Sequence, residues 1–390
     1  MANHGQQPVL PATQRALVLN SVRDPLDMAV DPAYPTPQAT AGSAVIQVLA
    51  AGVLAYGREI YSGARVYPFP TPMVPGYAAV GRVVAAGPDA VLLRPGDLVF
   101  ADPFIRGRDD DSARLILGLA AGGIPPARDL MRGLLWRDGV YAQFARLPLE
   151  NLHVLDEAAL LGDGDGGPKT GLGYAVEDLL AIGNMLVPYG GFRDVGLQPG
   201  EKVVVAPATG TFGGAAVPVA LAMGAREVVA MGRDGDKLSA LAAAAGPRVR
   251  TVRIAGDASA EAAEIRGGSG PADVFLDLAP PGSAASSHLA AGILALRRGG
   301  RASLMGGQWD EPARFPSFAI TANDLRLCGK WMYERADVAA FLRLVEAGAV
   351  RLGAAGGITV AGRFGLDEFE EAFQCAARNN RATSLTVIVP

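Results

Sequence analysis

A short segment, Ala208–Gly213, has the residue types and spacing that bind a phosphate group. It reads ATGTFG and follows KVVVAP, an apolar run with the composition of a buried strand. The spacing is that of a G-x-G-x-x-G turn with alanine in the first position. Small residues let the backbone approach a pyrophosphate, and the helix expected next presents N–H groups to it. We therefore predict cofactor contacts from Ala208, Thr209, Gly210, Thr211, Phe212 and Gly213.

The end of the next predicted strand, REVVAMG, should determine which dinucleotide binds. In NAD-binding folds an acidic residue stands there, about 20 residues after the glycine-rich turn. This chain has Gly232 and Arg233 there, with Lys237 shortly after. Glycine leaves room for a 2′-phosphate, and the two cations can pair with it, which favours NADP(H) over NAD(H). Alternatively, Arg233 is a solvated charge, and Asp234 or Asp236 either caps the next helix or takes the acidic role.

Two kinds of element pattern flank this turn. From about residue 16 to 154, short strands and turns predict a β-rich domain. After Pro199-Gly200, strands alternate with helices, one of them over 285–300, as in a doubly wound parallel sheet. Segments 115–123 and 127–136 have helical spacing and predict a helical insertion or lid over 106–138. We expect domains at 1–186 and 187–335, with 336–390 returning to the first domain.

Composition limits the class of protein. A chain of 390 residues suggests two domains. A net charge of -4 argues against nucleic-acid binding. Cys328 and Cys375 are too few for a disulfide framework and suggest buried thiols in a reducing compartment, the cytoplasm. No signal peptide is evident, and the uncharged stretch 206–225 is better explained as strand, turn and helix than as a membrane span.

Several segments together resemble the medium-chain dehydrogenase/reductase superfamily. They are AAGVLAYGREIYSG, PGYAAVGRVVAAGPDAVLLRPGDLVF, DGVYAQFARLPLENLHVL, PGEKVVVAPATGTFGGAAVPVALAMGA, LMGG and the C-terminal FGLDEFEEAFQCAARNNRATSLTVIVP. The resemblance covers roughly residues 16–390. It implies a GroES-like β-barrel catalytic domain and a Rossmann nucleotide-binding domain, and an NAD(P)-dependent oxidoreductase.

The chain departs from the zinc-dependent members at the metal site. Leu54 stands where they carry the first ligand, a cysteine, and Tyr77 stands where they carry a histidine. The accompanying glutamate is Ala78, and the four-cysteine lobe is replaced by a cysteine-free insertion. Leucine and tyrosine cannot assemble a zinc site, so we predict no metal. We expect the three histidines to be structural or solvent-exposed: His4, His153 and His288.

Loss of the metal changes the expected chemistry. Without a Lewis acid, hydride transfer to an activated C=C bond or a quinone is easier than transfer to an isolated ketone, because the charge spreads into an enolate. The alternatives are a metal-free ketone or aldehyde reductase and a non-catalytic NADPH-binding protein. Tyr56 and Tyr77 are the candidate proton donors, or rings that only fill space. With Leu54 they would line an apolar substrate wall.

The resemblance also implies further contacts and a partner. Val187 would lie near the nicotinamide, Leu278 and Ala279 near the adenosine ribose and the nicotinamide side, and backbone groups at 305–307 would hold the carboxamide. These last residues are Met305, Gly306 and Gly307. Segment 324–331, DLRLCGKW, would pair with a second copy in a homodimer.

Overall fold

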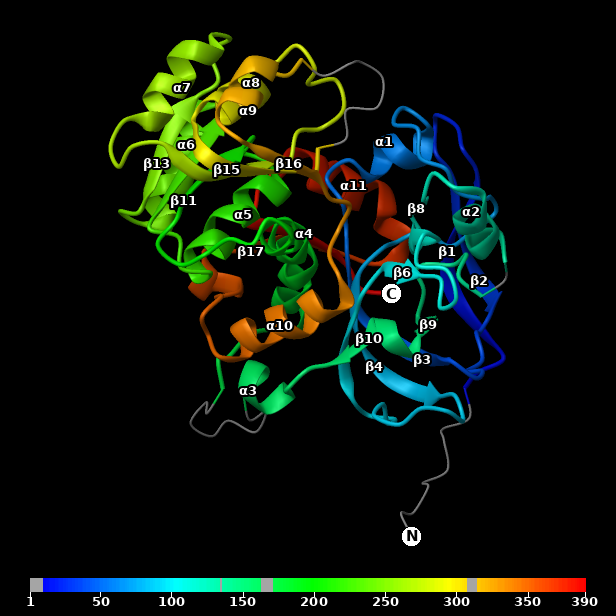
Figure 1. Cartoon of the computed structure of the whole chain (residues 1–390). Helices are drawn as coiled ribbons and strands as arrows, with labels where there is room; N and C mark the ends of the chain where they lie inside the picture. The colour runs from blue at the N-terminus through cyan, green and yellow to red at the C-terminus, as the bar shows by residue number, and fades with distance from the viewer. Residues whose placement is uncertain (1–9, 134, 163–170, 307–313) are drawn as a thin grey trace. The chain divides into compact units, whose positions relative to one another are not determined.

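The computed structural model describes residues 10–133, 135–162, 171–306 and 314–390 (Figure 1). The chain forms two compact units. The first unit comprises Met1–Ala181, Ile358–Asn380 and Ser384–Pro390, and the second comprises Ile182–Gly357 and Arg381–Thr383. The predicted boundaries lay at 186/187 and 335/336. Residues 336–357 join the second unit because α10 (Arg335–Glu346) packs on α4 (Ala181–Asp194), with the rings of Tyr189 and Phe341 5.1 Å apart.

The first unit contains a barrel-like sheet. Its strand order is β10-β5-β4-β3-β18-β17, and β9 also pairs with β3. The bounds are β3 (Ser43–Gly52), β4 (Ala79–Ala86), β5 (Leu98–Ala101), β9 (Phe144–Pro148), β10 (Leu152–Val154), β17 (Thr359–Phe364) and β18 (Ser384–Ile388). A separate hairpin is formed by β1 (Thr13–Ser21) and β2 (Asp27–Pro35), and the helices are α1 (Gly57–Ser62), α2 (Pro125–Arg132), α3 (Glu157–Leu161) and α11 (Phe369–Arg378).

The insertion at 106–138 is only partly helical. Segment 115–123 was expected to be a helix, and this expectation is wrong. It contributes to a three-stranded sheet of β6 (Phe104–Arg106), β7 (Arg114–Ile116) and β8 (Ala120–Ala121). Gly118 has φ +63° between β7 and β8, and a Cβ there would overlap with the backbone oxygen of Gly76. This glycine favours a turn over a continued helix. Helix α2 follows and overlaps the second segment that had helical spacing, 127–136, but it begins at Pro125 and ends at Arg132.

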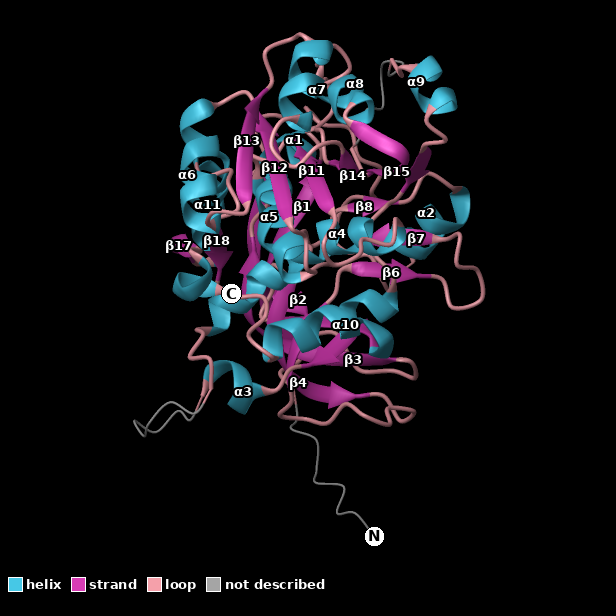
Figure 2. Cartoon of the chain, turned by 60° about the vertical axis from the view of Figure 1, so that its left-hand side comes forward, coloured by secondary structure: helices cyan, strands magenta, loops and turns pink. Residues whose placement is uncertain are grey.

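The second unit is built around a six-stranded parallel sheet (Figure 2). The strand order is β13-β12-β11-β14-β15-β16, with bounds β11 (Lys202–Ala206), β12 (Glu227–Gly232), β13 (Val249–Arg253), β14 (Ala272–Asp277), β15 (Leu296–Leu304) and β16 (Arg326–Gly329). The helices are α5 (Thr211–Ala222), α6 (Gly235–Ala245), α7 (Ala258–Arg266), α8 (His288–Leu294) and α9 (Ser317–Ala322). The expected helix over 285–300 is shorter, because β15 already begins at Leu296 and pairs with β14. The sheet confirms the predicted fold class.

Buried branched side chains explain why these strands form. In β11, β12 and β14 nearly every residue is buried, which is the composition expected of strands covered on both faces. Val204, Val229 and Phe275 belong to one core cluster with residues of α7 and α8. No helix among the described residues is both long and apolar enough to cross a membrane.

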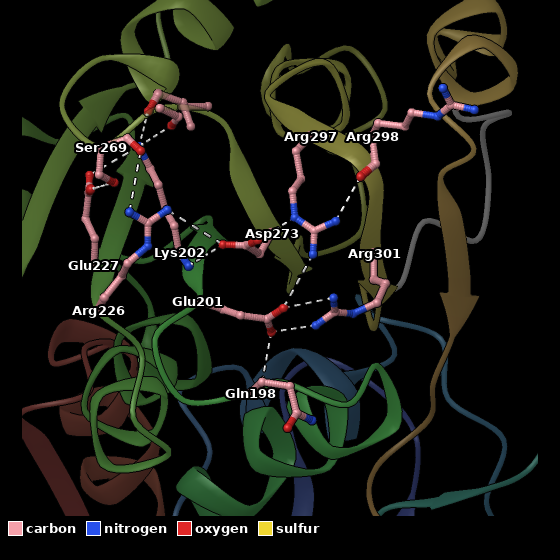
Figure 3. A network of polar contacts seen from close by, with 12 residues as sticks. Gln198, Glu201, Lys202, Arg226, Glu227, Ser269, Asp273, Arg297, Arg298 and Arg301 are labelled. Carbon is pink, nitrogen blue, oxygen red and sulfur yellow. Dashed lines mark hydrogen bonds and ion pairs between the residues drawn. The ribbon is translucent and has the colours of Figure 1, made fainter.

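Ion pairs hold the amino ends of these strands together (Figure 3). Glu201 pairs with Arg301 at 2.5 Å, and Asp273 pairs with Arg297 at 2.5 Å. The fully buried ammonium of Lys202 donates to the backbone oxygens of Ile265, Gly267 and Gly270, at 2.7, 3.2 and 2.8 Å. It also lies 3.3 Å from Glu227. These contacts fix the strands at the edge opposite to the one that carries the predicted cofactor residues.

Candidate functional site

The predicted phosphate turn joins β11 to α5. Gly210 immediately precedes the helix in an extended conformation (φ −89°, ψ 179°), and no side chain caps the helix N terminus. The N–H of Ala208 donates to the Met231 oxygen at 2.6 Å, which ties the turn to β12. A Cβ at Gly213 would overlap with the Pro207 oxygen, so only glycine permits this close packing of helix on strand. Such a turn fits a pyrophosphate, which binds at helix N termini.

The end of β12 carries the residues predicted to select the cofactor. The sequence suggested that Gly232 leaves room for a 2′-phosphate. The structure adds a second reason for glycine, because a Cβ at this position would lie 2.6 Å from the Thr209 methyl group. Asp234 caps α6 by accepting from the Lys237 N–H at 3.0 Å, and its carboxylate lies 3.8 Å from the Lys237 ammonium. Capping is therefore the role that the structure gives Asp234. Arg233 is exposed.

A second arginine lies beside Arg233. Arg253 ends β13 in register with Gly232, and its Nε donates to the Arg233 backbone oxygen at 3.3 Å. Both arginine side chains are exposed at the carboxyl edge of the sheet. Sequence reasoning missed Arg253 because nothing in the local pattern shows which strand end will adjoin β12. The one indication in the sequence was that Arg253 stands near the end of a predicted strand, where parallel sheets bind their ligands.

The carboxyl ends of β14 and β15 meet at a buried carboxylate. Asp277 accepts from the Ala279 N–H at 3.0 Å, and the Met305 N–H donates to the Asp277 backbone oxygen at 3.0 Å. The imidazole Nε2 of buried His288 lies 3.2 Å from the same carboxylate. Its Nδ1 lies 2.8 Å from the Ser286 hydroxyl. These contacts position the predicted cofactor residues at the two strand ends: Leu278, Ala279, Met305 and Gly306.

The predicted cofactor residue Val187 stands apart from these strand ends. Val187 is half-buried in α4, within the second unit. Gly307 lies outside the described residues, as does His4. The remaining histidine, His153, has its Nε2 3.8 Å from the buried Asp102 carboxylate in the first unit.

In the first unit, Tyr77 is buried within a group of tyrosines. Its hydroxyl lies 3.4 Å from the position that a Cβ on Gly52 would take. Burial raises the pKa of this hydroxyl. The preceding Gly76 has φ +99°, and a Cβ there would lie 2.6 Å from the Tyr141 ring, so this turn requires glycine. Leu54, which is also buried, lies in the segment between β3 and α1.

Tyr61 and Tyr141 hold the turn that carries Tyr77. The Tyr61 hydroxyl donates to the Gly118 oxygen at 3.0 Å and accepts from the Gly76 N–H at 3.2 Å. The Tyr141 hydroxyl donates to the Gly52 oxygen at 3.0 Å. Both rings are fully buried and pack near Phe373. Their hydroxyls therefore have a structural role. The sequence did not predict this role, because the partners are backbone groups far away in sequence.

Tyr56 differs from these structural tyrosines. It is half-buried and immediately precedes α1. The guanidinium carbon of Arg65 lies 4.1 Å from the centre of its ring. Burial raises the pKa of the Tyr56 hydroxyl, the neighbouring hydroxyls of Tyr67 and Tyr77 act in the same direction, and Arg65 opposes them. Tyr56 and Tyr77 are thus near enough to influence each other, whereas Arg65 was not anticipated from the sequence.

The side chains that could bind a metal ion are dispersed. In the part of the chain that the structure describes, no three His, Cys, Asp or Glu side chains are grouped as a metal site. Leu54 and Tyr77 stand at the positions where zinc-dependent members of the superfamily carry a cysteine and a histidine. Of the two cysteines, Cys375 is buried and Cys328 is half-buried, and both are free thiols.

Comparisons with known proteins agree with this architecture. A family model described as an alcohol dehydrogenase GroES-like domain matches residues 40–157, and one described as a zinc-binding dehydrogenase matches residues 212–347. A comparison with curated protein sequences gives no match.

Solved structures show the same fold over nearly the whole chain. A protein from Sinorhizobium meliloti 1021 classed as an alcohol dehydrogenase is 25% identical, with a TM-score of 0.73 and coverage of 98% of both chains. An E. coli CFT073 alcohol dehydrogenase complexed with NADH is 15% identical, with a TM-score of 0.75 and coverage of 97% and 100%. A second Sinorhizobium meliloti 1021 protein, classed as a zinc-binding dehydrogenase and bound to NADP, is 19% identical, with a TM-score of 0.73 and coverage of 97% and 100%. Because the two family models together span more than half of the chain and match its two units in order, the chain belongs to the medium-chain dehydrogenase/reductase superfamily of oxidoreductases.

Proposed function

We propose that this protein is an NADPH-dependent, zinc-independent reductase of an activated C=C bond or a quinone in a hydrophobic small molecule. One observation carries the proposal. The residues at the expected metal-ligand positions, Leu54 and Tyr77, are buried apolar or phenolic side chains, while the dinucleotide turn at Ala208–Gly213 keeps the required geometry. Such a protein retains the turn that binds a nicotinamide cofactor, but it lacks the cysteine and histidine side chains that usually bind zinc.

The second unit fits a nicotinamide dinucleotide. The pyrophosphate would lie at the N terminus of α5, and the ribose at the end of β12. Related folds are known with NADH and with NADP, so the fold itself does not select between them. The preference for NADPH is supported by Arg233 and Arg253, two exposed arginines at the carboxyl edge of the sheet. The Nε of Arg253 donates to the backbone oxygen of Arg233, which holds the two residues side by side. Guanidinium groups bind phosphate through charge-assisted hydrogen bonds.

The chain's own residues would support the reduction by donating a proton and by forming an apolar wall around the substrate. When bound, the cofactor supplies a hydride, and negative charge then develops on the substrate. In an enone or quinone this charge is delocalised, so a single proton donor suffices. Tyr56 is the proton donor that we favour. The hydroxyl groups of Tyr61 and Tyr141 already donate their hydrogen bonds to backbone oxygens. Tyr77 and Leu54 would form part of an apolar substrate wall.

Substrate panels test this proposal. NADPH oxidation would be followed with enones, quinones and matched saturated ketones and aldehydes. The proposal predicts turnover of the conjugated acceptors. Turnover restricted to ketones and aldehydes would instead support a metal-free carbonyl reductase. NADPH binding without oxidation of any acceptor would identify a non-catalytic binding protein.

We also propose that the protein forms a homodimer through the β16 edge. Among the described residues, strand β16 pairs with β15 on one side and ends the sheet. None of its residues is buried, and α9 before it has no buried residue. Nearby, Phe318 is 85% exposed and Trp331 is 38% exposed. An open strand edge beside apolar side chains is suited to pairing with a second copy. Sedimentation showing only monomer at every concentration would reject the dimer.

A further inference from the structure

We propose that Arg65 is a positioning residue for Tyr56: it holds the phenol ring by stacking on it and stabilises the phenolate left after proton donation. This inference rests on the proposed function, in which Tyr56 is the proton donor, and it specifies how that donor is made effective. Nothing in the sequence pattern around Arg65 indicates such a role, because the contact depends on the turn after α1.

The residues on either side of α1, Tyr56 and Arg65, are in contact with each other. Tyr56 immediately precedes the helix, and Arg65 follows its last turn. The Arg65 N–H donates to the Glu59 backbone oxygen at 2.8 Å, which brings the arginine back over the helix. Its guanidinium carbon then lies 4.1 Å from the centre of the Tyr56 ring. This distance is well within the range of a cation–π contact.

Arg65 is placed to act electrostatically rather than only to fill space. Its side chain is 18% exposed, and Glu59, its carboxylate partner at 3.4 Å, is 55% exposed. Among the described groups that influence the Tyr56 hydroxyl, Tyr67, Tyr77 and Glu59 all disfavour the phenolate. Arg65 carries the only positive charge in that set. A cation shielded from water has a stronger effect on a nearby charge than an exposed one.

The proposed proton transfer balances as follows. The substrate's β-carbon gains the hydride, and the electron pair of the C=C bond moves onto the α-carbon and the conjugated oxygen. The O–H bond of Tyr56 breaks, its electron pair stays on the phenolate oxygen, and the proton joins the enolate. The dihydronicotinamide is oxidised and the substrate is reduced. The phenolate oxygen of Tyr56 later takes up one proton from the solvent, which is the proton consumed in the overall reaction. Arg65 cannot itself supply the proton, because a guanidinium does not deprotonate in proteins.

A double-mutant cycle separates this role from a structural one. Arg65→Met should lower kcat about tenfold and change KM little, the size expected for a shielded cation–π contact. Arg65→Lys should restore part of the rate, and guanidinium ion added to an Arg65→Ala variant should do the same. In a Tyr56→Phe background, Arg65→Met should have no further effect on kcat. Arg58→Met is the matched control, because Arg58 belongs to α1 but pairs with Asp24 at 2.6 Å.

A second measurement does not depend on turnover. With difluorotyrosine at position 56 of the full chain, ¹⁹F NMR would follow ionisation of that phenol. Arg65→Met should raise its pKa, and Arg58→Met should leave it unchanged. Equal pKa values with and without Arg65, or additive effects of Arg65→Met and Tyr56→Phe on kcat, would overturn the inference. Reduction of enones by a Tyr56→Phe variant at the wild-type rate would also overturn it while leaving the reductase proposal intact. A wild-type protein that reduces no acceptor would reject the proposed function, and the ¹⁹F titration would still decide the role of Arg65.

Discussion

The hydroxyl oxygen of Tyr61 accepts a hydrogen bond of 3.2 Å from the backbone N–H of Gly76, one residue before Tyr77. The same hydroxyl donates to the Gly118 oxygen at 3.0 Å. One buried phenol therefore joins α1, the turn at Gly76 and the turn between β7 and β8. This contact distinguishes the tyrosines that build the first unit from Tyr56, which we propose as a proton donor.

Loss of the Tyr61 hydroxyl should cost stability. Tyr61→Phe leaves a buried N–H and a buried carbonyl oxygen without their partner, which costs about 1–3 kcal/mol. Urea unfolding followed by near-ultraviolet circular dichroism would measure the change in the free energy of unfolding. Tyr56→Phe, at a half-buried position, should change the unfolding free energy less than Tyr61→Phe. The reverse order would contradict the roles assigned to the two tyrosines.

Tyr34 should make the protein lose stability at alkaline pH. Burial raises the pKa of its hydroxyl to about 12, Asp138 adds to the shift and Arg137 opposes it. In the unfolded chain a tyrosine has a pKa of about 10. The folded state therefore holds the proton more tightly, so the stabilisation is complete below about pH 10 and is lost as the pH rises towards 12.

The Tyr34→Phe variant tests this pH dependence. A pKa difference of about two corresponds to at most about 2.7 kcal/mol, and the contribution of this one group is less because its side chain is partly open to solvent. Unfolding free energies of wild type and variant, measured across the interval from pH 10 to 12, should converge as the pH rises. A constant difference between the two proteins would show that Tyr34 does not cause the loss.

The cofactor preference should depend on Arg233 and Arg253. Replacing either by alanine should weaken NADPH binding about tenfold, since a hydrogen bond to a charged group contributes on the order of 1.5–3 kcal/mol. NADH binding should hardly change, because NADH lacks the 2′-phosphate. Calorimetry or fluorescence titration with both cofactors gives the ratio. Equal losses for NADPH and NADH would assign these arginines a structural role instead.

Removal of the buried ammonium of Lys202 should destabilise the second unit strongly. Lys202→Met leaves three backbone oxygens and Glu227 without a buried cation, at a cost of about 3–5 kcal/mol. Arg298→Met provides the control, because Arg298 and Asp324 form an exposed pair. Such pairs contribute about 1 kcal/mol or less. Similar unfolding free energies for the two variants would argue against the role of the buried network.

Local patterns predicted the elements that depend on local chemistry. The continuous apolar run Val203–Ala206 and the small residues after it were enough to predict β11, the turn that follows it and α5. Segment 115–123 was misassigned because its spacing fits a helix, and the competing requirement is a glycine turn packed against Gly76. The second-unit membership of 336–357 depends on packing of Phe341 against Tyr189, which lies about 150 positions earlier and cannot be read from either segment.

The candidate site likewise contains some residues that the sequence indicated and others that only the fold brings into place. Tyr56 and Tyr77 were found because they stand at or beside positions where the superfamily carries zinc-site residues. Arg65 and Arg253 were not predicted because the contacts that distinguish them are set by the fold: the ring of Tyr56 in one case and the end of a neighbouring strand in the other. A lone arginine in a sequence gives no indication of the ring or the strand end that it will adjoin.

Whether the enzyme works without zinc can be decided by the rate of NADPH oxidation with an enone, measured on protein whose metal content has been determined before and after treatment with a chelator. The metal-stripped protein should reduce the enone at the untreated rate, and added zinc should not increase that rate. Loss of enone reduction on chelation, with recovery on addition of zinc, would show that the protein is a zinc-dependent reductase.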